Sequence, residues 1–318
     1  MQQQLDFPEA YTAPATPDHD FDALEGMART LCATGEYRVA RRFRRRDRYA
    51  DAAGRALRTA LFVDTETTGL DAARDAIIEL AVVPFTYCEA DGSVCEVGPA
   101  ASWLEDPGRP IPAPVTELTG ITDAMVRGQR IDEVAVAGLL EGASLVIAHN
   151  ARFDRPFVER RLRGFEALPW ACSVNEIPWK EHGCGSSNLE YLLHQSCGEF
   201  FGAHRAADDC LAAIHLLATR TPKGGVPMRM LLESSQRVTV RLWAIASPFD
   251  SKELLKGRGY RWSAGDGGRP KAWYRDCAGD QADAEHAWLA ESVYAGRDPS
   301  VIRREVIDAT RRYSTRAS

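Results

Sequence analysis

The segment LFVDTETTGL, residues 61–70, joins an apolar strand pattern to two acidic residues. Asp64 and Glu66 are two positions apart, so on a strand their side chains leave the same face. Two carboxylates on one face of an apolar strand are costly to bury unless a cation compensates them. A strand that ends in a polar turn explains a lone pair of this kind more simply. This segment alone therefore leaves open a metal site and a plain strand end.

Two later segments place further acids at the ends of predicted core elements. VIAHNARFDRPF (146–157) puts Asp154 near the start of a helix, just after an apolar strand. GAHRAADDCLAAIHLL (202–217) puts His204 five residues before Asp209, at the entry to another helix. Acids at helix starts also cap the helix or interact with its dipole, so each segment has a structural alternative.

Taken together, the three segments supply four carboxylates and one histidine where an α/β sheet gathers its site. Hard oxygen ligands favour Mg²⁺ or Mn²⁺ over zinc. Two such ions stabilise both the attacking and the leaving oxygen of an in-line phosphoryl displacement. A histidine, with an ordinary pKa of about 6.5, is suited to take a proton from water near neutrality.

Composition is that of a soluble globular protein. The chain has 318 residues, of which 45% are hydrophobic and 26% charged, and a net charge of −6. It contains no apolar run of the roughly 20 residues that a membrane helix needs, and its N-terminus does not resemble a signal peptide. We expect a cytoplasmic protein, associated with the bacterial nucleoid, whose eight cysteines are free thiols.

Texture along the chain predicts four regions. Residues 1–20 are predicted to form a disordered tail and 21–57 a helical, arginine-rich segment. Strand and helix signals alternate over 58–221, which predicts a mixed sheet with helices on both faces. Two prolines and two glycines in 221–227 mark a boundary, and 228–318 is predicted to be a small α+β accessory module.

The patterns DxETTGL, HNxxFD and HxAxxD resemble, in order and spacing, the three motifs of the DEDDh (DnaQ-like) exonuclease superfamily. The chain is thus similar over about residues 58–220 to the proofreading epsilon subunit of bacterial DNA polymerase III. The resemblance implies an RNase H-like exonuclease fold with a mixed five-stranded sheet flanked by helices. It also implies release of nucleoside 5′-monophosphates from a free 3′ end.

The same resemblance assigns roles to residues. Two Mg²⁺ or Mn²⁺ ions would be held by four carboxylates, with a histidine as general base: Asp64, Glu66, Asp154, Asp209 and His204. The substrate contacts that it implies are Thr67, Leu70, Gly120, Ile121, Asn150 and Phe153. Gly120 and Ile121 lie in ELTGITDAM (117–125), which resembles the family segment that wedges the last bases apart.

Three features outside the motifs suggest partners. The segment YRVARRFRRRDRY (37–49) either follows nucleic-acid phosphates or forms a solvated helix face. Aromatic and basic residues alternate around 260–274, which suits single-stranded nucleic acid but also a small domain's core. Gln2, Leu5 and Phe7 fit Q-x-x-L-x-F, a pattern that resembles peptides that bind the bacterial sliding clamp.

The sequence therefore predicts a metal-dependent 3′→5′ exonuclease acting on DNA, with single-stranded 3′ ends as substrate, in repair or replication. A 3′→5′ exoribonuclease remains an alternative, because the motifs are shared. A catalytically inactive nucleic-acid-binding module is a third reading, which the five intact site residues disfavour.

Overall fold

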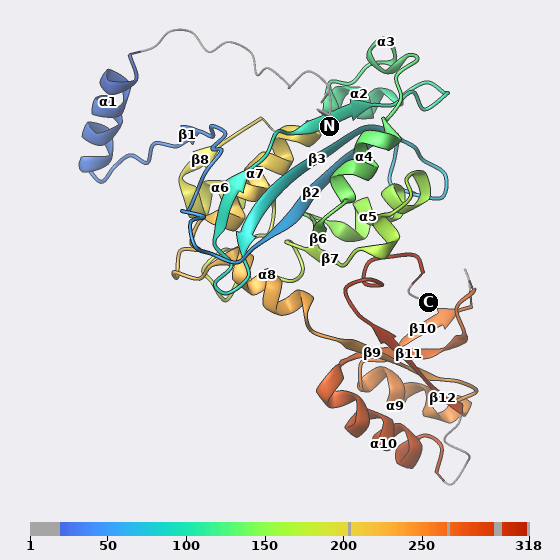
Figure 1. The fold of residues 1–318 in the computed structure, drawn as a ribbon. Coiled ribbons are helices and arrows are strands. Elements are labelled where there is room, and N and C mark those ends of the chain that lie inside the picture. The colour runs from blue at the N-terminus through green and yellow to red at the C-terminus, as the bar shows by residue number, and fades with distance from the viewer. Residues whose placement is uncertain (1–19, 203–204, 266–267, 296–300, 317–318) are drawn as a thin grey trace.

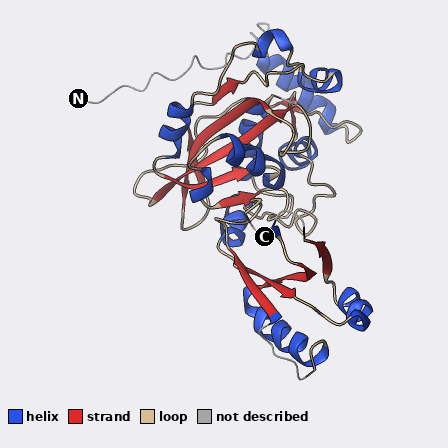
Figure 2. Ribbon diagram, turned by 90° about the vertical axis from the view of Figure 1, so that its right-hand side faces the viewer, coloured by secondary structure: helices blue, strands red, loops and turns tan. Residues whose placement is uncertain are grey.

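The computed structural model describes residues 20–202, 205–265, 268–295 and 301–316. The chain forms a larger α/β part and a smaller α+β part (Figure 1). Figure 2 shows their two sheets as separate groups of strands, the larger one flanked by helices. No helix among the described residues is long and apolar enough to cross a membrane.

The larger part begins with an N-terminal helix and ends with a helix before the second sheet. Its elements are α1 (Phe21–Ala33), β1 (Arg41–Arg42), β2 (Leu57–Thr67), β3 (Ile77–Cys88), β4 (Val94–Val97), β5 (Ala101–Leu104), α2 (Ala113–Thr119), α3 (Asp123–Val126), α4 (Glu133–Leu140), β6 (Ala143–Ala148), α5 (Ala151–Arg161), η1 (Phe165–Ala167), β7 (Trp170–Cys172), α6 (Leu189–Cys197), β8 (Glu199–Phe200), α7 (Ala206–Ala218) and α8 (Pro227–Ser235).

Its main sheet is mixed, in the order β4-β3-β2-β6-β7, with β5 also pairing to β3. The β2–β3 pair is antiparallel, whereas β2–β6 and β6–β7 are parallel. Six strands therefore fill five positions, because β4 and β5 share one edge of β3. The break between them is at Gly98, where an added Cβ would lie 2.9 Å from Pro84 Cγ. The predicted fold class, a mixed sheet flanked by helices, is confirmed.

The alternation of side chains along β2 divides the core into two layers. Phe62 packs in one cluster with Cys210 of α7, and Val63 packs in another with Phe157 of α5. The same alternation carries into the polar end of the strand, so Asp64 and Glu66 share the α7 face. The strand end is thus the place where side chains from both helical layers can meet.

The segment at 37–49 does not form a helix. β1 pairs in parallel with β8, and the arginines around it form ion pairs, among them Arg41–Glu25, Arg46–Glu199 and Arg48–Glu96. The helix-face interpretation of this segment is therefore wrong. The prediction of a helical region over 21–57 holds only for α1.

The smaller part is built on an antiparallel sheet in the order β10-β11-β9-β12. Its elements are β9 (Thr239–Ala244), η2 (Phe249–Ser251), α9 (Lys252–Gly257), β10 (Arg261–Ala264), β11 (Lys271–Ala278), η4 (Gly279–Gln281), α10 (Ala282–Ser292) and β12 (Ile302–Ile307). Leu255 of α9 and Leu289 of α10 pack with Leu242 of β9 in a core of their own.

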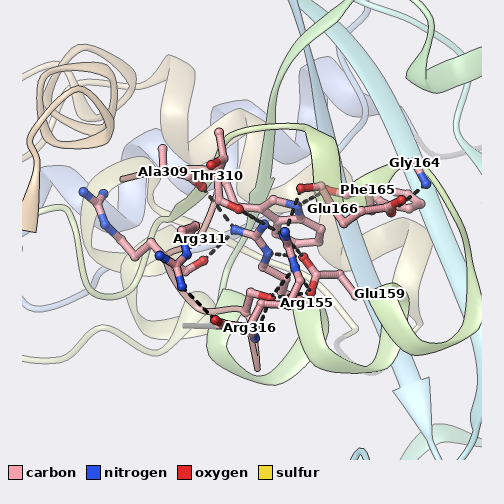
Figure 3. A network of polar contacts seen from close by, with 12 residues as sticks. Arg155, Glu159, Gly164, Phe165, Glu166, Ala309, Thr310, Arg311 and Arg316 are labelled. Atoms are coloured by element: carbon pink, nitrogen blue, oxygen red, sulfur yellow. Dashed lines mark hydrogen bonds and ion pairs between the residues drawn. The ribbon is translucent and has the colours of Figure 1, made fainter. Parts of the chain in front are cut away.

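The boundary between the parts lies later than 221–227. Met228 and Leu231 of α8 belong to the core of the larger part, so the crossing to the second sheet follows α8. The end of the chain then returns to the larger part. Figure 3 shows Arg155 of α5 at the centre of this contact. Its guanidinium donates to the carbonyl oxygens of Ala309, Thr310 and Arg312 at 3.1, 2.5 and 2.6 Å.

Candidate active site

Three carboxylates meet at the end of β2. Asp64 and Glu66 come from β2 and Asp209 from the first turn of α7, and their oxygen atoms all lie within 4.8 Å of one another. All three side chains are partly exposed, so the group opens to solvent. Hard oxygen donors at this spacing fit Mg²⁺ or Mn²⁺.

Asp154 approaches the same strand end from the opposite layer. It stands in the first turn of α5, is 2% exposed, and accepts hydrogen bonds from Thr65 N at 3.1 Å and Thr65 Oγ1 at 2.8 Å. It is not among the three carboxylates within 4.8 Å, but its charge contributes to the raised pKa of Asp64. The structure thus brings the four predicted ligands to one place, with Asp154 set slightly apart.

The carboxylates disfavour one another's ionised form. Burial, followed by the charges of Asp154, Asp209 and Glu66, raises the pKa of Asp64 well above its usual range. Burial, followed by the charges of Asp209, Glu79 and Asp154, raises the pKa of Glu66 to about 8. Burial raises the pKa of Asp154 to about 7, against the lowering effect of the Thr65 hydrogen bonds. A bound cation would reverse this pattern, because it favours ionised ligands.

A cleft of about 620 Å³ opens beside the carboxylates. Its walls are formed by the ends of β2 and β6, by α5, and by the first turns of α6 and α7 together with the loops that precede them. The lining residues are Asp64, Thr65, Glu66, Leu70, His149, Asn150, Phe153, Asp154, Val174, Asn175, Ser187, Asn188, Leu189, Glu190, Phe201 and Asp209. Leu70 is 87% exposed, so one apolar side chain stands at the mouth.

His149 braces one wall of the cleft. Its Nδ1 lies 2.8 Å from Ser173 Oγ and its Nε2 2.9 Å from the Ser187 carbonyl oxygen. Burial lowers the pKa of His149 to about 4. The neutral ring can therefore donate from Nε2 to Ser187 and accept from the Ser173 hydroxyl, which fixes the loop before α6.

Glu79 of β3 anchors the start of α7. It is 1% exposed and lies opposite Glu66 in the β2–β3 register. Its carboxylate accepts from Arg205 Nη2 at 3.0 Å, Ser102 Oγ at 3.0 Å and Ala206 N at 3.3 Å. Because Arg205 and Ala206 begin α7, this contact fixes the helix that carries Asp209.

The predicted substrate residues differ in whether they line the cleft. Leu70, Asn150 and Phe153 line the cleft. Thr67 is buried, and its hydroxyl donates to the Gly69 carbonyl at 2.6 Å, so its side chain serves the turn.

Ile121 is 0% exposed and packs with Ile78, Ile111 and Val126. The prediction that its side chain contacts substrate is therefore wrong. Gly120 is exposed with a φ of 73° but does not line the cleft. His204, Gln2, Leu5 and Phe7 lie outside the described residues, so their roles stay predictions.

Sequence reasoning missed the residues that hold the ligands. Thr65 lies between the two acids of the first motif. Its side chain leaves the other face of the strand, and nothing in the sequence pairs it with Asp154. Glu79 carried a signal, since it is the lone acid in the apolar run AIIELAVVPF. His149 lies within the second motif, but only the fold places Ser173 and Ser187 on its two nitrogens.

The family model described as Exonuclease matches residues 61–217. The epsilon subunit of DNA polymerase III from Treponema pallidum is 33% identical over 165 residues, which cover 49% of this chain and 73% of that protein. The PolC-type DNA polymerase III of Clostridium perfringens is 41% identical over 159 residues, or 48% of this chain and 10% of that protein. Its Bacillus subtilis counterpart is 32% identical over 157 residues, with the same two shares. The chain therefore spans a small fraction of the PolC-type relatives' length.

Two solved structures are similar in part. Exonuclease X, in complex with 5′ overhanging duplex DNA, is 26% identical with a TM-score of 0.37, over 50% of this chain and 89% of that one. E. coli exonuclease I, in complex with an oligonucleotide, is 16% identical with a TM-score of 0.43, over 70% of this chain and 63% of that one.

Proposed function

The chain belongs to the exonuclease family whose model spans residues 61–217, and we propose that it removes nucleotides one at a time from single-stranded 3′ ends of DNA. The products would be nucleoside 5′-monophosphates. One observation carries the proposal: Asp64, Glu66 and Asp209 converge within 4.8 Å beside an open cleft. Such a group is costly without a cation and poised for phosphodiester chemistry with one.

The donor set fits the divalent metal on which the family depends. Asp64, Glu66 and Asp209 would hold one ion, and Asp154 beside Asp64 would complete the site for a second. Two such ions would lower the pKa of the attacking water and stabilise the charge that develops on the phosphate. The raised pKa values of Asp64 and Glu66 support this assignment, because metal-free carboxylates at this spacing repel one another.

The chain's own groups would bind and orient the strand end. Phe153 and Leu70 offer apolar surface to the terminal base, and Asn150 offers an amide for a polar contact. Asp154, which Thr65 holds in place, keeps a fixed carboxylate beside Asp64 at the metal site. His204, in the segment before α7, would accept the water's proton as general base.

Digestion of end-labelled single-stranded DNA, duplex DNA and RNA tests the proposal. Asp209→Asn should lower kcat by about a hundredfold or more, whereas its neighbour Asp208→Asn is the matched control and should remain active. Degradation from the 3′ end of single-stranded DNA, with mononucleotide products, supports the proposal. Faster degradation of RNA would replace DNA by RNA as the substrate, and equal activity of the two variants would remove the metal-ligand role.

We further propose that the N-terminal Q-x-x-L-x-F peptide brings the enzyme to a sliding clamp. Relatives named as parts of DNA polymerase III are consistent with work at replicating DNA. Purified clamp should retain the full chain, and Leu5→Ala with Phe7→Ala should abolish retention. Equal retention of that variant would contradict this partner.

A further inference from the structure

The second sheet has two unlike faces. In the antiparallel register, Arg261 lies opposite Tyr274 and Asp276 lies opposite Arg241, so these four side chains share one face. The other face carries the apolar residues that α9 and α10 cover. In Figure 1 both helices lie on the side of this sheet away from the larger part. The arginine-bearing face is thus the one turned toward the larger part.

A cleft of about 430 Å³ lies between this face, α5 and the returning chain end. Its lining residues are Arg152, Pro156, Thr239, Arg241, Arg261, Arg269, Tyr274, Asp276, Ile307, Arg312, Tyr313, Ser314 and Thr315. Five of them are arginines, and a single one is acidic. A chain with a net charge of −6 therefore concentrates positive charge at this cleft.

Acidic neighbours neutralise only part of this charge: Arg312 is paired with Glu176 at 3.0 Å, outside the cleft lining. Asp276 is shared, since it accepts from Arg241 at 2.6 Å and from Arg261 at 3.0 Å. Arg152 and Arg269 are exposed, and neither forms an ion pair within the described part of the chain. Positive charge therefore exceeds negative charge in the cleft, through Arg152, Arg269 and the shared pair of Arg261, and guanidinium groups are suited to bind phosphate oxygens.

The Tyr274 ring holds two of the arginines in place. The guanidinium carbons of Arg241 and Arg261 each lie 4.9 Å from its centroid. Stacking on a ring and sharing one carboxylate limits the freedom of both side chains. Fewer rotamers would then be lost when an anion binds.

One helix separates this cleft from the candidate active site. Asn150 and Phe153, at the start of α5, line the active-site cleft, whereas Arg152 and Pro156 line the arginine cleft. A strand whose 3′ end lies at the carboxylates can therefore reach the arginines by crossing the first turn of α5. A nucleic-acid strand on this path carries regularly spaced phosphates, whose negative charges would come close to the arginines.

We propose that the arginine cleft binds phosphates of the substrate DNA strand on the 5′ side of its terminal nucleotides. This proposal rests on the proposed function for the direction of the strand, and it assigns a role to the second sheet that the catalytic chemistry does not need. It makes the two parts of the chain a single binding surface for one strand.

The test is binding of a fluorescent oligothymidylate to the full chain in excess chelator, so that cleavage does not contribute. The variant is Arg261→Ala with Arg269→Ala, both exposed residues outside the catalytic site. The matched control is Arg229→Ala with Arg304→Ala, which removes two exposed, ion-paired arginines from other surfaces. The thermal unfolding midpoints of the wild type, the cleft variant and the control variant should agree, which shows that all three are folded.

Each phosphate contact on a single strand contributes about 0.7 to the slope of log K against log salt, or about a three- to fourfold factor at physiological salt. We therefore expect about a tenfold weaker Kd and a salt slope shallower by about 1.4 for the cleft variant. The control should match the wild type. Equal losses in both variants, or no loss in the cleft variant, would overturn the proposal.

Hydrolysis of the p-nitrophenyl ester of thymidine 5′-monophosphate separates this proposal from the proposed function. The ester is too small to reach the arginine cleft, so the cleft variant should hydrolyse it at the wild-type rate. Failure of the wild type to cleave DNA or ester, with binding still dependent on the arginines, would contradict the proposed function alone. Normal cleavage with arginine-independent binding would contradict the cleft proposal alone.

Discussion

Asp154 accepts two hydrogen bonds from Thr65, at 3.1 Å from its backbone nitrogen and 2.8 Å from its hydroxyl. The contact joins the first turn of α5 to the end of β2, between the two acids of the first motif. It sets where a carboxylate from one helical layer stands relative to two carboxylates on the other face of the strand. The position of Asp154 within the group therefore depends on one threonine.

Thr65→Val should weaken both stability and catalysis. The valine keeps the shape and the backbone donor but removes the hydroxyl, which leaves Asp154 with one partner in a buried setting. We expect a loss of about 1–3 kcal/mol in the free energy of unfolding and a lower kcat. Urea denaturation and strand digestion measure these, with Thr65→Ser as the variant that should recover both. Thr86→Val is the matched control, because it removes a half-buried threonine hydroxyl of β3 that contacts Glu96 and no site residue. Wild-type kcat in Thr65→Val would remove the positioning role.

Divalent metal should stabilise the protein, because the carboxylates of Asp64, Glu66 and Asp209 repel one another when no cation is bound. Mn²⁺ at a hundredfold excess over its Kd should add about 2.7 kcal/mol to the free energy of unfolding. Asp64→Asn should raise the unfolding temperature in chelator and abolish most of the gain with Mn²⁺. Differential scanning calorimetry measures both, with exposed Glu117→Gln as control. A wild type whose melting ignores Mn²⁺ would contradict the assigned site.

Breaking the Glu79–Arg205 pair should cost more from one side than from the other. Arg205→Ala leaves a 1% exposed carboxylate without its cation, which we expect to cost about 3–5 kcal/mol. Glu79→Gln leaves a guanidinium whose side chain is 34% exposed and can regain water, so its cost should be nearer 1–2 kcal/mol. Urea denaturation of both variants decides; an equal or reversed order would mean that Glu79 is not the buried anchor of α7.

The three motifs predicted β2, β6, α5 and α7 and the convergence of their four acids, because each motif combines an apolar period with an acid at an element's end. Ile121 shows where this reasoning stops. An apolar residue between two short helices has no period of its own, so only packing against Ile78 and Val126 decides that it is buried. The sequence also did not predict that Asp154 and Asp209 come from helices on opposite faces of the sheet. The motifs define the order of the elements along the chain, but not the face of the sheet on which each helix packs.

The arginine cleft and the chain end were beyond prediction for a different reason. Arg152, Arg241 and Arg312 are far apart in sequence, and only the return of the chain end brings them together. That return is held largely by backbone carbonyl oxygens, which every residue type offers. Neither the composition of residues 308–316 nor the spacing of residues within them predicts that this segment packs against α5.

Acid should erode the stabilising contribution of His149. Its pKa in the folded protein is about 4, below the ordinary value of 6.5. The unfolded chain therefore takes up a proton in this window while the native ring stays neutral, and stability that is complete above pH 6.5 falls toward pH 4. The unfolding free energy of the wild type minus that of His149→Asn should shrink as pH falls through this window. Urea denaturation across this pH range measures the difference. The carboxyl groups with raised pKa values titrate in both proteins, so their effect cancels. A difference that stays constant with pH would contradict a neutral, buried histidine.

Arg155→Met should release the end of the chain from α5. The guanidinium is 0% exposed and holds three carbonyl oxygens of residues 309–312 as well as Glu159 at 2.7 Å. Its loss leaves these groups unpaired in a buried place, and we expect a cost of about 3–5 kcal/mol. Detached carbonyls would also open the peptide bonds after Arg311 and Arg312 to trypsin. Limited digestion followed by mass spectrometry should show early cleavage there in Arg155→Met but not in Arg163→Met, whose arginine is exposed. The same cleavage rate in both variants would mean that Arg155 does not hold the chain end in place.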